Sequence, residues 1–198
     1  MFSGGLDSTA VLYRLLTETE DDLRVHHIRM QNREGRADAE QAAVESIVEW
    51  CGRHLRGFRF SQSGLDFSTL EAIPIDFISV AYVACQVAID TQGCNRIAVV
   101  TLARDLDEMK RSACEAQRRV FAAMYDCYRA RKLGAPAIEW LYPVYSFSKP
   151  QIASLLGPEL CSLTWSCRLP VNTPVGRQSC GNCKPCRARI DLSAALQN

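Results

Sequence analysis

The sequence predicts an α/β fold in which helices cover both faces of a parallel, Rossmann-like sheet. Strand-like segments alternate with segments whose apolar residues recur at helical spacing, as is typical of a doubly wound sheet. The clearest strand, residues 96–101 (RIAVVT), is rich in β-branched residues and unalternating, which indicates burial on both faces. A chain of 198 residues, 47% of them hydrophobic, is long enough to bury a sizeable core.

The expected helices and strands alternate along the chain, which begins with a helix. Taken along the chain, they are a helix over 9–16, a strand over 24–30, a helix over 37–55, a strand over 58–60, a helix over 77–89, a strand over 96–101, a helix over 107–132, a strand over 139–144 and a short helix from Ser148 to Gly157. Only Met1 and Phe2 precede the first loop, so the first strand is either a stub or begins upstream of this chain.

Composition and charge narrow the function classes. The net charge is +1, which gives no electrostatic argument for binding nucleic acid or an anionic membrane. No apolar run is long enough to span a bilayer and no signal peptide is recognisable, so we expect a cytoplasmic protein. Six of the ten cysteines are scattered through helical or strand-like stretches of the chain and are interpreted as small buried hydrophobes kept reduced. They are Cys51, Cys85, Cys94, Cys114, Cys127 and Cys161.

A glycine-rich loop, SGGLDST, occupies residues 3–9 and leads directly into the first helix. We expect Gly4 and Gly5 to allow a tight turn that brings backbone close to a ligand, and Asp7 and Ser8 to cap the helix. Unpaired N–H groups at a helix start favour an anion, so the loop is interpreted as a phosphate site, although it matches neither GxxxxGK[ST] nor GxGxxG. The alternative is a glycine turn that caps an ordinary helix. The candidate residues are Ser3, Gly4, Gly5, Leu6, Asp7, Ser8 and Thr9.

Four cysteines near the C-terminus are spaced C-x12-C-x2-C-x2-C: Cys167, Cys180, Cys183 and Cys186. Four thiolates at this spacing match a tetrahedral structural zinc site. An iron–sulfur cluster and unliganded thiols are the alternatives, because spacing alone does not select the ion. We therefore divide the chain into an α/β nucleotide-binding domain, residues 1–160, and a cysteine-rich segment, residues 161–198, packed on it.

The two ends together resemble one enzyme family. SGGLDST resembles the PP-loop of the N-type ATP pyrophosphatases, which cleave ATP between its α and β phosphates. Combined with TWSC at 164–167 and CGNCKPCRAR at 180–189, the chain resembles the 7-cyano-7-deazaguanine synthase (QueC) family, a carbon–nitrogen ligase family. The resemblance runs along the chain in order but is dense only at its ends.

The resemblance implies a PP-loop fold, a structural Zn²⁺ on the four cysteines, and use of ATP with Mg²⁺. It also implies that 7-carboxy-7-deazaguanine is activated as an acyl adenylate and passed to ammonia, after which a second ATP yields the nitrile of the queuosine pathway. On this basis the candidate catalytic residues are Asp7, Ser8 and Lys149. Asp7 is placed for a hydrated Mg²⁺, and Lys149 for a phosphate, the alternative being that Lys149 is a solvated first-turn lysine.

The middle of the chain departs from the family pattern. At the carboxyl edge of the sheet, where a base would bind, we expect the segments 29–34, 73–77 and 105–111 to converge. There Asp76 or Asp105 could accept hydrogen bonds from a guanine-like edge, with Gln31 completing the set; the alternative is that the two aspartates are turn residues or caps. The three histidines, His26, His27 and His54, have no evident partner and are interpreted as strand or surface residues.

Three other functions remain open at this stage. A QueC-like enzyme of the antiphage-defence kind would join the deazaguanine acyl group to a protein amine instead of ammonia. A zinc-stabilised nucleotide-binding module would have no activity. A PP-loop enzyme of tRNA thiolation is disfavoured by the near-neutral charge and the tight cysteine cluster. The oligomeric state, a homodimer included, is open.

Overall fold

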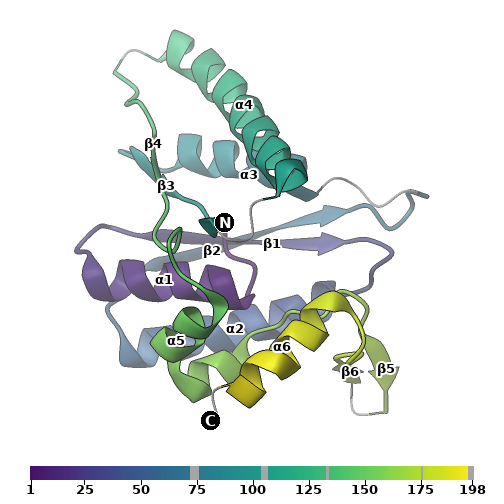
Figure 1. The fold of residues 1–198 in the computed structure, drawn as a ribbon. Helices are drawn as coiled ribbons and strands as arrows, with labels where there is room; N and C mark the ends of the chain where they lie inside the picture. Colours follow the sequence, from purple (N-terminus) through teal and green to yellow (C-terminus); the bar gives the residue numbers. More distant parts are fainter. Residues whose placement is uncertain (72–75, 104–106, 133, 175, 196–198) are drawn as a thin grey trace.

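A computed structural model describes residues 1–71, 76–103, 107–132, 134–174 and 176–195, with only the backbone over 191–195. It confirms the α/β class, with parallel strand pairs and helices on both sides of them (Figure 1). The elements run α1 Leu6–Glu18, β1 Arg24–Gln31, α2 Ala37–His54, β2 Arg59–Asp66, α3 Asp76–Asp90, β3 Arg96–Ala98, α4 Glu108–Arg131, β4 Glu139–Leu141, α5 Lys149–Leu163, β5 Val171–Thr173, β6 Gly176–Gln178 and α6 Lys184–Ala195.

The strands form three pairs. β1 and β2 are parallel with Arg24 opposite Arg59, β3 and β4 are parallel with Arg96 opposite Glu139, and β5 and β6 form an antiparallel hairpin. The N–H of Phe2 donates to the carbonyl of His26 at 2.7 Å, so the residues before the glycine-rich loop lie beside β1. The loop is thereby fixed at the start of α1, close to the parallel strands.

Two helical layers enclose these strands. Figure 1 shows α1, α2, α5 and α6 on one side of β1 and β2, and α3 with the long α4 on the other. The first layer packs through aliphatic residues such as Leu12, Ile47 and Ile152, which are fully or almost fully buried. The second packs Ala81 and Cys85 of α3 against Phe121 of α4. Most of α4 is exposed, so it depends on this single apolar stripe.

Several boundaries differ from the sequence expectation. β2 extends over 59–66 rather than 58–60, while the strand expected over 96–101 ends at Ala98. β1 is the more buried strand, because it has α2 on one face and α3 on the other. The helix that begins after Ser148 does not end at Gly157: the chain kinks there, with φ at +71°, and resumes through Pro158 to Leu163.

The scattered cysteines are only partly buried. Cys51 and Cys85 are buried as expected, and burial raises the pKa of Cys51 to about 11, so its thiol stays protonated. Cys94, Cys114 and Cys161 are half-buried. The expectation is wrong for Cys127, which is exposed on α4 because that helix turns little of its surface to the core.

His26 and His27 lie on strand β1, in agreement with their interpretation as strand residues, and both are buried with partners that the sequence did not reveal. The ring nitrogens of His26 lie 2.8 Å and 3.0 Å from the hydroxyls of Ser61 and Ser63 on β2, and Nδ1 of His27 lies 2.9 Å from the carbonyl of Phe2. Desolvation lowers the pKa of His26 from 6.5 to about 4 and also lowers that of His27. Both imidazoles are therefore neutral in the folded protein at neutral pH.

We expect these histidines to make folding sensitive to acid. The unfolded chain binds protons on them below pH 6.5, whereas folded His26 stays neutral down to about pH 4, so stability falls as the pH drops through that window. Urea unfolding at several pH values should show a shallower decline for His26→Gln than for the unaltered protein. His54→Gln, at the exposed end of α2, should leave the slope unchanged. Equal slopes in all three proteins would contradict the assignment.

Candidate functional site

The glycine-rich loop turns sharply at Gly4, whose φ is +69°. A Cβ at this position would meet Val44 Cγ2 at 3.0 Å and the Val44 backbone nitrogen at 3.2 Å, so α2 leaves no room for a side chain. The carbonyl of Gly4 accepts a hydrogen bond of 2.9 Å from the N–H of Trp165, which ties the loop to the segment that follows α5. Gly4 is therefore required both by conformation and by space.

Gly5 begins α1 and has an ordinary φ of −82°, so only the first glycine of the pair needs the left-handed region. Its carbonyl accepts from the hydroxyls of Ser8 and Thr9 at 3.0 Å and 2.9 Å. The expectation that Asp7 and Ser8 cap the helix is wrong, because both lie inside its first turn and no side chain caps it.

The start of α1 offers hydrogen-bond donors without partners. Among the residues that the structure describes, the N–H groups of Leu6, Asp7 and Ser8 donate to none, and the first helical hydrogen bond runs from Thr9 N to Gly5 O. Ser3 and Ser8 add hydroxyls 3.0 Å apart at the same place. Unpaired N–H groups with the positive end of a helix dipole are suited to an anion such as phosphate.

Lys149 reaches this loop from the start of α5. Ser148 caps α5 through a capping box with Gln151, which fixes the direction of the helix's first turn. From there Lys149 forms an ion pair with Asp7 Oδ2, while Asp7 Oδ1 is buried and has no hydrogen-bond partner among the described residues. The structure thus joins two sequence-selected residues that are 142 positions apart.

A cavity of about 1180 Å³ opens in front of the loop. It exceeds the roughly 300–1,000 Å³ of a typical single-ligand site, so it has room for a nucleotide and a second molecule. Residues from three parts of the chain line this cavity. From the loop come Ser3, Gly5, Asp7 and Ser8; from the α3–α4 layer Asp76, Val80, Lys110 and Phe121; and from the C-terminal half Lys149, Trp165, Arg168 and Lys184.

Next to the cavity lies a cluster of five charged residues that we call the Arg36 cluster, and all of them except Glu34 line the cavity: Glu34, Arg36, Glu40, Asp76 and Arg168. Arg36 Nη1 lies 2.7 Å from Glu40 Oε1, and Arg36 Nη2 lies 2.6 Å from Asp76 Oδ2. Burial raises the pKa of the Glu40 carboxyl, and the charge of Arg36 opposes that shift. Of the two aspartates selected from the sequence, Asp76 therefore lies in the cavity wall, and Asp105 falls outside the described residues.

Gln31 stands apart from Asp76. In the amide orientation that satisfies both ends, its oxygen accepts from the guanidinium of Arg29 and its nitrogen lies 3.2 Å from Asp66 Oδ2. It is not among the residues that line the cavity.

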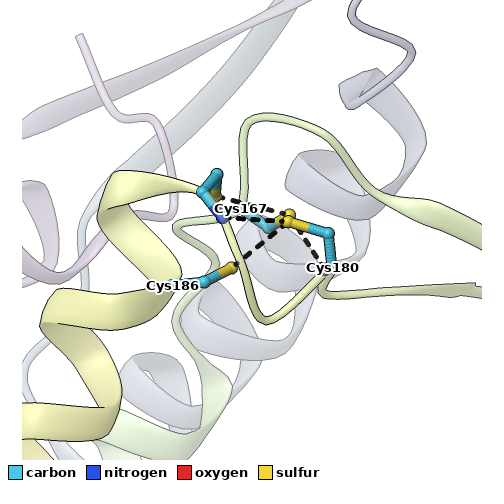
Figure 2. Close-up of side chains that lie close together, drawn as sticks. Cys167, Cys180 and Cys186 are labelled. Carbon is cyan, nitrogen blue, oxygen red and sulfur yellow. Dashed lines mark hydrogen bonds between the residues drawn. The ribbon is translucent and has the colours of Figure 1, made fainter.

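The four C-terminal cysteines converge between the segment that follows α5 and the start of α6 (Figure 2). Their sulfur atoms all lie within 4.8 Å of one another, with Cys180 to Cys186 and Cys167 to Cys183 each at 4.0 Å. Four sulfurs bound at about 2.3 Å around one tetrahedral ion would be separated by about 3.8 Å. The arrangement therefore fits a single metal ion. A [4Fe–4S] cube would hold its ligands farther apart, because each cysteine binds a different iron.

Backbone N–H groups favour ionised sulfur at Cys180, whereas burial raises the pKa of the Cys167 and Cys186 thiols. The N–H of Cys183 donates to Cys180 Sγ and the N–H of Cys180 donates to Cys167 Sγ, both at 3.3 Å. Hydrogen bonds from the backbone of Cys183 and Asn182 lower the pKa of Cys180. Thiolates are the form in which cysteine binds metals.

The fold and the site define an α/β protein with parallel strand pairs, a glycine-rich loop at the start of α1 and four clustered cysteines that could hold a metal ion. A solved structure with the same fold is the U34-tRNA thiolase NcsA from Methanococcus maripaludis with its [4Fe-4S] cluster, at 16% identity and a TM-score of 0.52. The similarity covers 99% of this chain and 63% of the thiolase chain, so this chain spans less than two thirds of its length. No protein-family model and no curated protein matches the sequence. None of the helices within the described ranges is both long and apolar enough to span a bilayer.

Sequence reasoning missed Arg36, Glu40 and Arg168. Arg36 and Glu40 read as an ordinary i, i+4 pair at the start of a helix, and their link to Asp76 depends on tertiary structure. Arg168 directly follows Cys167, and this position beside a metal-ligand candidate was the one available signal.

Proposed function

We propose that this chain is an ATP-dependent enzyme that adenylates the carboxylate of 7-carboxy-7-deazaguanine and transfers the acyl group to nitrogen. The observation that carries the proposal is the shared cavity in which the unpaired N–H groups of α1, the Asp7–Lys149 pair and the Arg36 cluster face one space. One wall of the cavity offers hydrogen-bond donors that suit the phosphates of a nucleotide. Another wall offers carboxylates that suit a base with N–H donors.

The phosphate end rests on α1 and Lys149. The N–H groups of Leu6, Asp7 and Ser8 would bind phosphate oxygens, and Lys149 would exchange Asp7 for a phosphate when ATP enters. The carboxylate of the substrate then attacks the α-phosphorus, the bond to the β-phosphate oxygen breaks, and pyrophosphate leaves. Positioning and neutralisation of charge account for catalysis of such a step.

Asp7 is the residue that would hold Mg²⁺. One of its oxygens is buried without a partner among the described residues, and carboxylate is a ligand that Mg²⁺ prefers. When bound, Mg²⁺ would supply positive charge to the leaving pyrophosphate.

The second half-reaction needs only a nucleophilic nitrogen. The amine attacks the acyl carbon, the bond from that carbon to the AMP oxygen breaks, and the amine loses a proton to give an amide. With ammonia as acceptor, a second ATP would activate the amide oxygen, and loss of AMP and two protons would leave the nitrile. A protein amine as acceptor would stop at the amide, as in the antiphage-defence alternative.

We also propose zinc as the ion of the four-cysteine site, which would have a structural role. All four thiolates fit one tetrahedral ion, and this leaves no open position for chemistry. The backbone contact from Trp165 to Gly4 lies between the cysteines and the phosphate loop, so the metal would support the loop without touching the nucleotide.

tRNA thiolation is the second candidate, favoured by the structural similarity to the U34-tRNA thiolase. At 16% identity that similarity concerns the fold. The close sulfur spacing and the net charge of +1 support the deazaguanine proposal instead.

We expect 7-carboxy-7-deazaguanine to stimulate release of pyrophosphate, with AMP as the other product of ATP. Lys149→Met should lower this rate by about 10²-fold, the effect of removing one donor at a developing charge. Lys132→Met, on the exposed end of α4, should leave it unchanged. Coupled pyrophosphate detection and mass spectrometry of the products measure both.

Mass spectrometry of the same reaction products also identifies the nitrogen acceptor of the acyl group. A nitrile formed with ammonia supports the synthase reaction, whereas an amide on protein supports the defence alternative. If ADP is produced, or if no 7-deazaguanine carboxylate stimulates turnover, the proposed function is wrong. Sulfur transfer to tRNA with formation of AMP would support the thiolase candidate.

A further inference from the structure

The Arg36 cluster is an ion-pair network centred on a largely buried guanidinium, and four of its five members line the cavity. The side chain of Arg36 is 13% exposed and that of Glu34 is 10% exposed. Arg36 Nε lies 2.5 Å from Glu34 Oε2, and its other two nitrogens pair with Glu40 and Asp76. One guanidinium therefore fixes two carboxylates that are its neighbours in the sequence and a third, Asp76, that lies 40 residues away along the chain.

Arg168 joins the network from the cysteine segment. Its Nη2 lies 3.0 Å from Glu34 Oε1 and 4.0 Å from Asp76 Oδ2. Because Arg168 follows Cys167, which is 1% exposed in the four-cysteine site, its backbone is fixed by that site. The network thus connects the metal segment with the wall of the cavity.

The network leaves Asp76 Oδ1 with neither a hydrogen bond nor an ion pair among the described residues. Three carboxylates face two guanidinium groups, so the cluster carries a net charge of −1. Asp76 Oδ2 is engaged by Arg36, but Asp76 Oδ1 is buried and has no hydrogen-bond partner within the described part of the chain. A buried acceptor without a donor is costly, and a ligand with N–H groups would remove that cost.

The chemistry of a guanine-like edge fits this vacancy. Its ring N–H and exocyclic amine are two adjacent donors, and a carboxylate offers two acceptor oxygens with about four lone-pair sites. A carboxylate that is already oriented loses less conformational entropy on binding such an edge than a mobile carboxylate does.

We propose that Arg36 and Arg168 are positioning residues that hold the Asp76 carboxylate for the donor edge of a guanine-like base. This inference rests on the proposed function for its substrate class. It deepens that function by naming the residue that reads the base and the two that orient it. The bound base would then stand with its carboxylate free to reach the phosphate end of the same cavity.

The test is direct binding of 7-deazaguanine, which lacks the reactive carboxylate and therefore reports recognition alone. Titration calorimetry on the full chain should show binding to the unaltered protein. The affinity of Asp76→Asn and of Arg36→Gln should be lower by about tenfold or more, which is the effect of one charge-assisted hydrogen bond. Arg36→Lys should recover part of the affinity. Arg59→Gln, which breaks the exposed pair with Asp22, is the matched control and should bind normally.

Two further measurements separate positioning from a merely structural role. The double variant Arg36→Gln/Asp76→Asn should bind no more weakly than Asp76→Asn, because Arg36 acts through Asp76. 7-Deazahypoxanthine, which lacks the exocyclic amine, should bind the unaltered protein more weakly than 7-deazaguanine. Arg168→Gln should weaken binding while the metal content stays the same.

Additive losses in the double variant, or equal binding of the two bases, would overturn the inference. So would absence of 7-deazaguanine binding to the unaltered protein. The proposed function is decided separately by the pyrophosphate assay: binding without stimulated turnover would contradict that function and leave the base site standing.

Discussion

Gly4→Ala is expected to abolish nucleotide-dependent turnover, whereas Gly5→Ala should preserve most of it. The two glycines are neighbours in one loop, yet their surroundings differ. At Gly4 the φ of +69° costs an alanine about 1–2 kcal/mol. In addition, its Cβ would meet the backbone nitrogen of Val44 at 3.2 Å, an atom of α2 that has no freedom to rotate away.

The loop would relieve this strain by moving away from α2, and the N–H groups of Leu6, Asp7 and Ser8 would no longer face a common phosphate. Gly5 is the matched control because its φ of −82° suits any residue. Its Cβ would meet Ser3 Oγ and the carbonyl of Trp165 at ordinary distances of 3.4 Å and 3.5 Å.

Pyrophosphate release and ATP binding by calorimetry would be measured on both variants, with circular dichroism to confirm that each is folded. Similar ATP binding by the two variants would contradict the assigned role of Gly4.

The fold class could be predicted because it depends on short-range patterns. Alternating strand and helix signals gave the parallel α/β architecture, and Ser148 marked the start of α5 correctly. Strand lengths were harder to predict. β2 has a mixed sequence, RFSQSGLD, and becomes a strand because β1 pairs with it along eight residues. Residues 99–101 have the better strand composition but lie outside the β3–β4 ladder.

Some residues of the candidate site could be recognised from local sequence motifs, whereas others come together only through tertiary packing. Asp7 and the four cysteines were found from motifs, because spacing along the chain is enough to bring such residues together. Asp76 was selected only by its expected place at the sheet edge, and its partner Arg36 could not be found at all. Forty residues separate the two, and both α2 and α3 must pack before their side chains meet. The burial of His26 was missed for a similar reason, since Ser61 and Ser63 reach it from a strand whose extent was underestimated.

Cys167→Ser is expected to cause the largest loss of stability. Cys167 is 1% exposed, and its sulfur accepts from the N–H of Cys180 as well as facing Cys183. A structural zinc site couples binding of the ion to folding, so losing one ligand weakens both. A loss of even about 3 kcal/mol lowers the unfolding temperature of a chain this long by about 6–12 °C.

Elemental analysis should find about one zinc per chain in the unaltered protein, as one Cys₄ site binds one ion, and little in Cys167→Ser. Cys127→Ser is the control, because Cys127 is exposed on α4 and stands outside the four-cysteine site; its metal content and unfolding temperature should not change. Removing the ion with a chelator should reproduce the Cys167→Ser effect in the unaltered protein and have no further effect in the variant.

The contact from Trp165 to the carbonyl of Gly4 predicts that ATP binding weakens as well, since the glycine-rich loop loses its support. Iron in place of zinc, or a metal-free protein of normal stability, would contradict a structural zinc site.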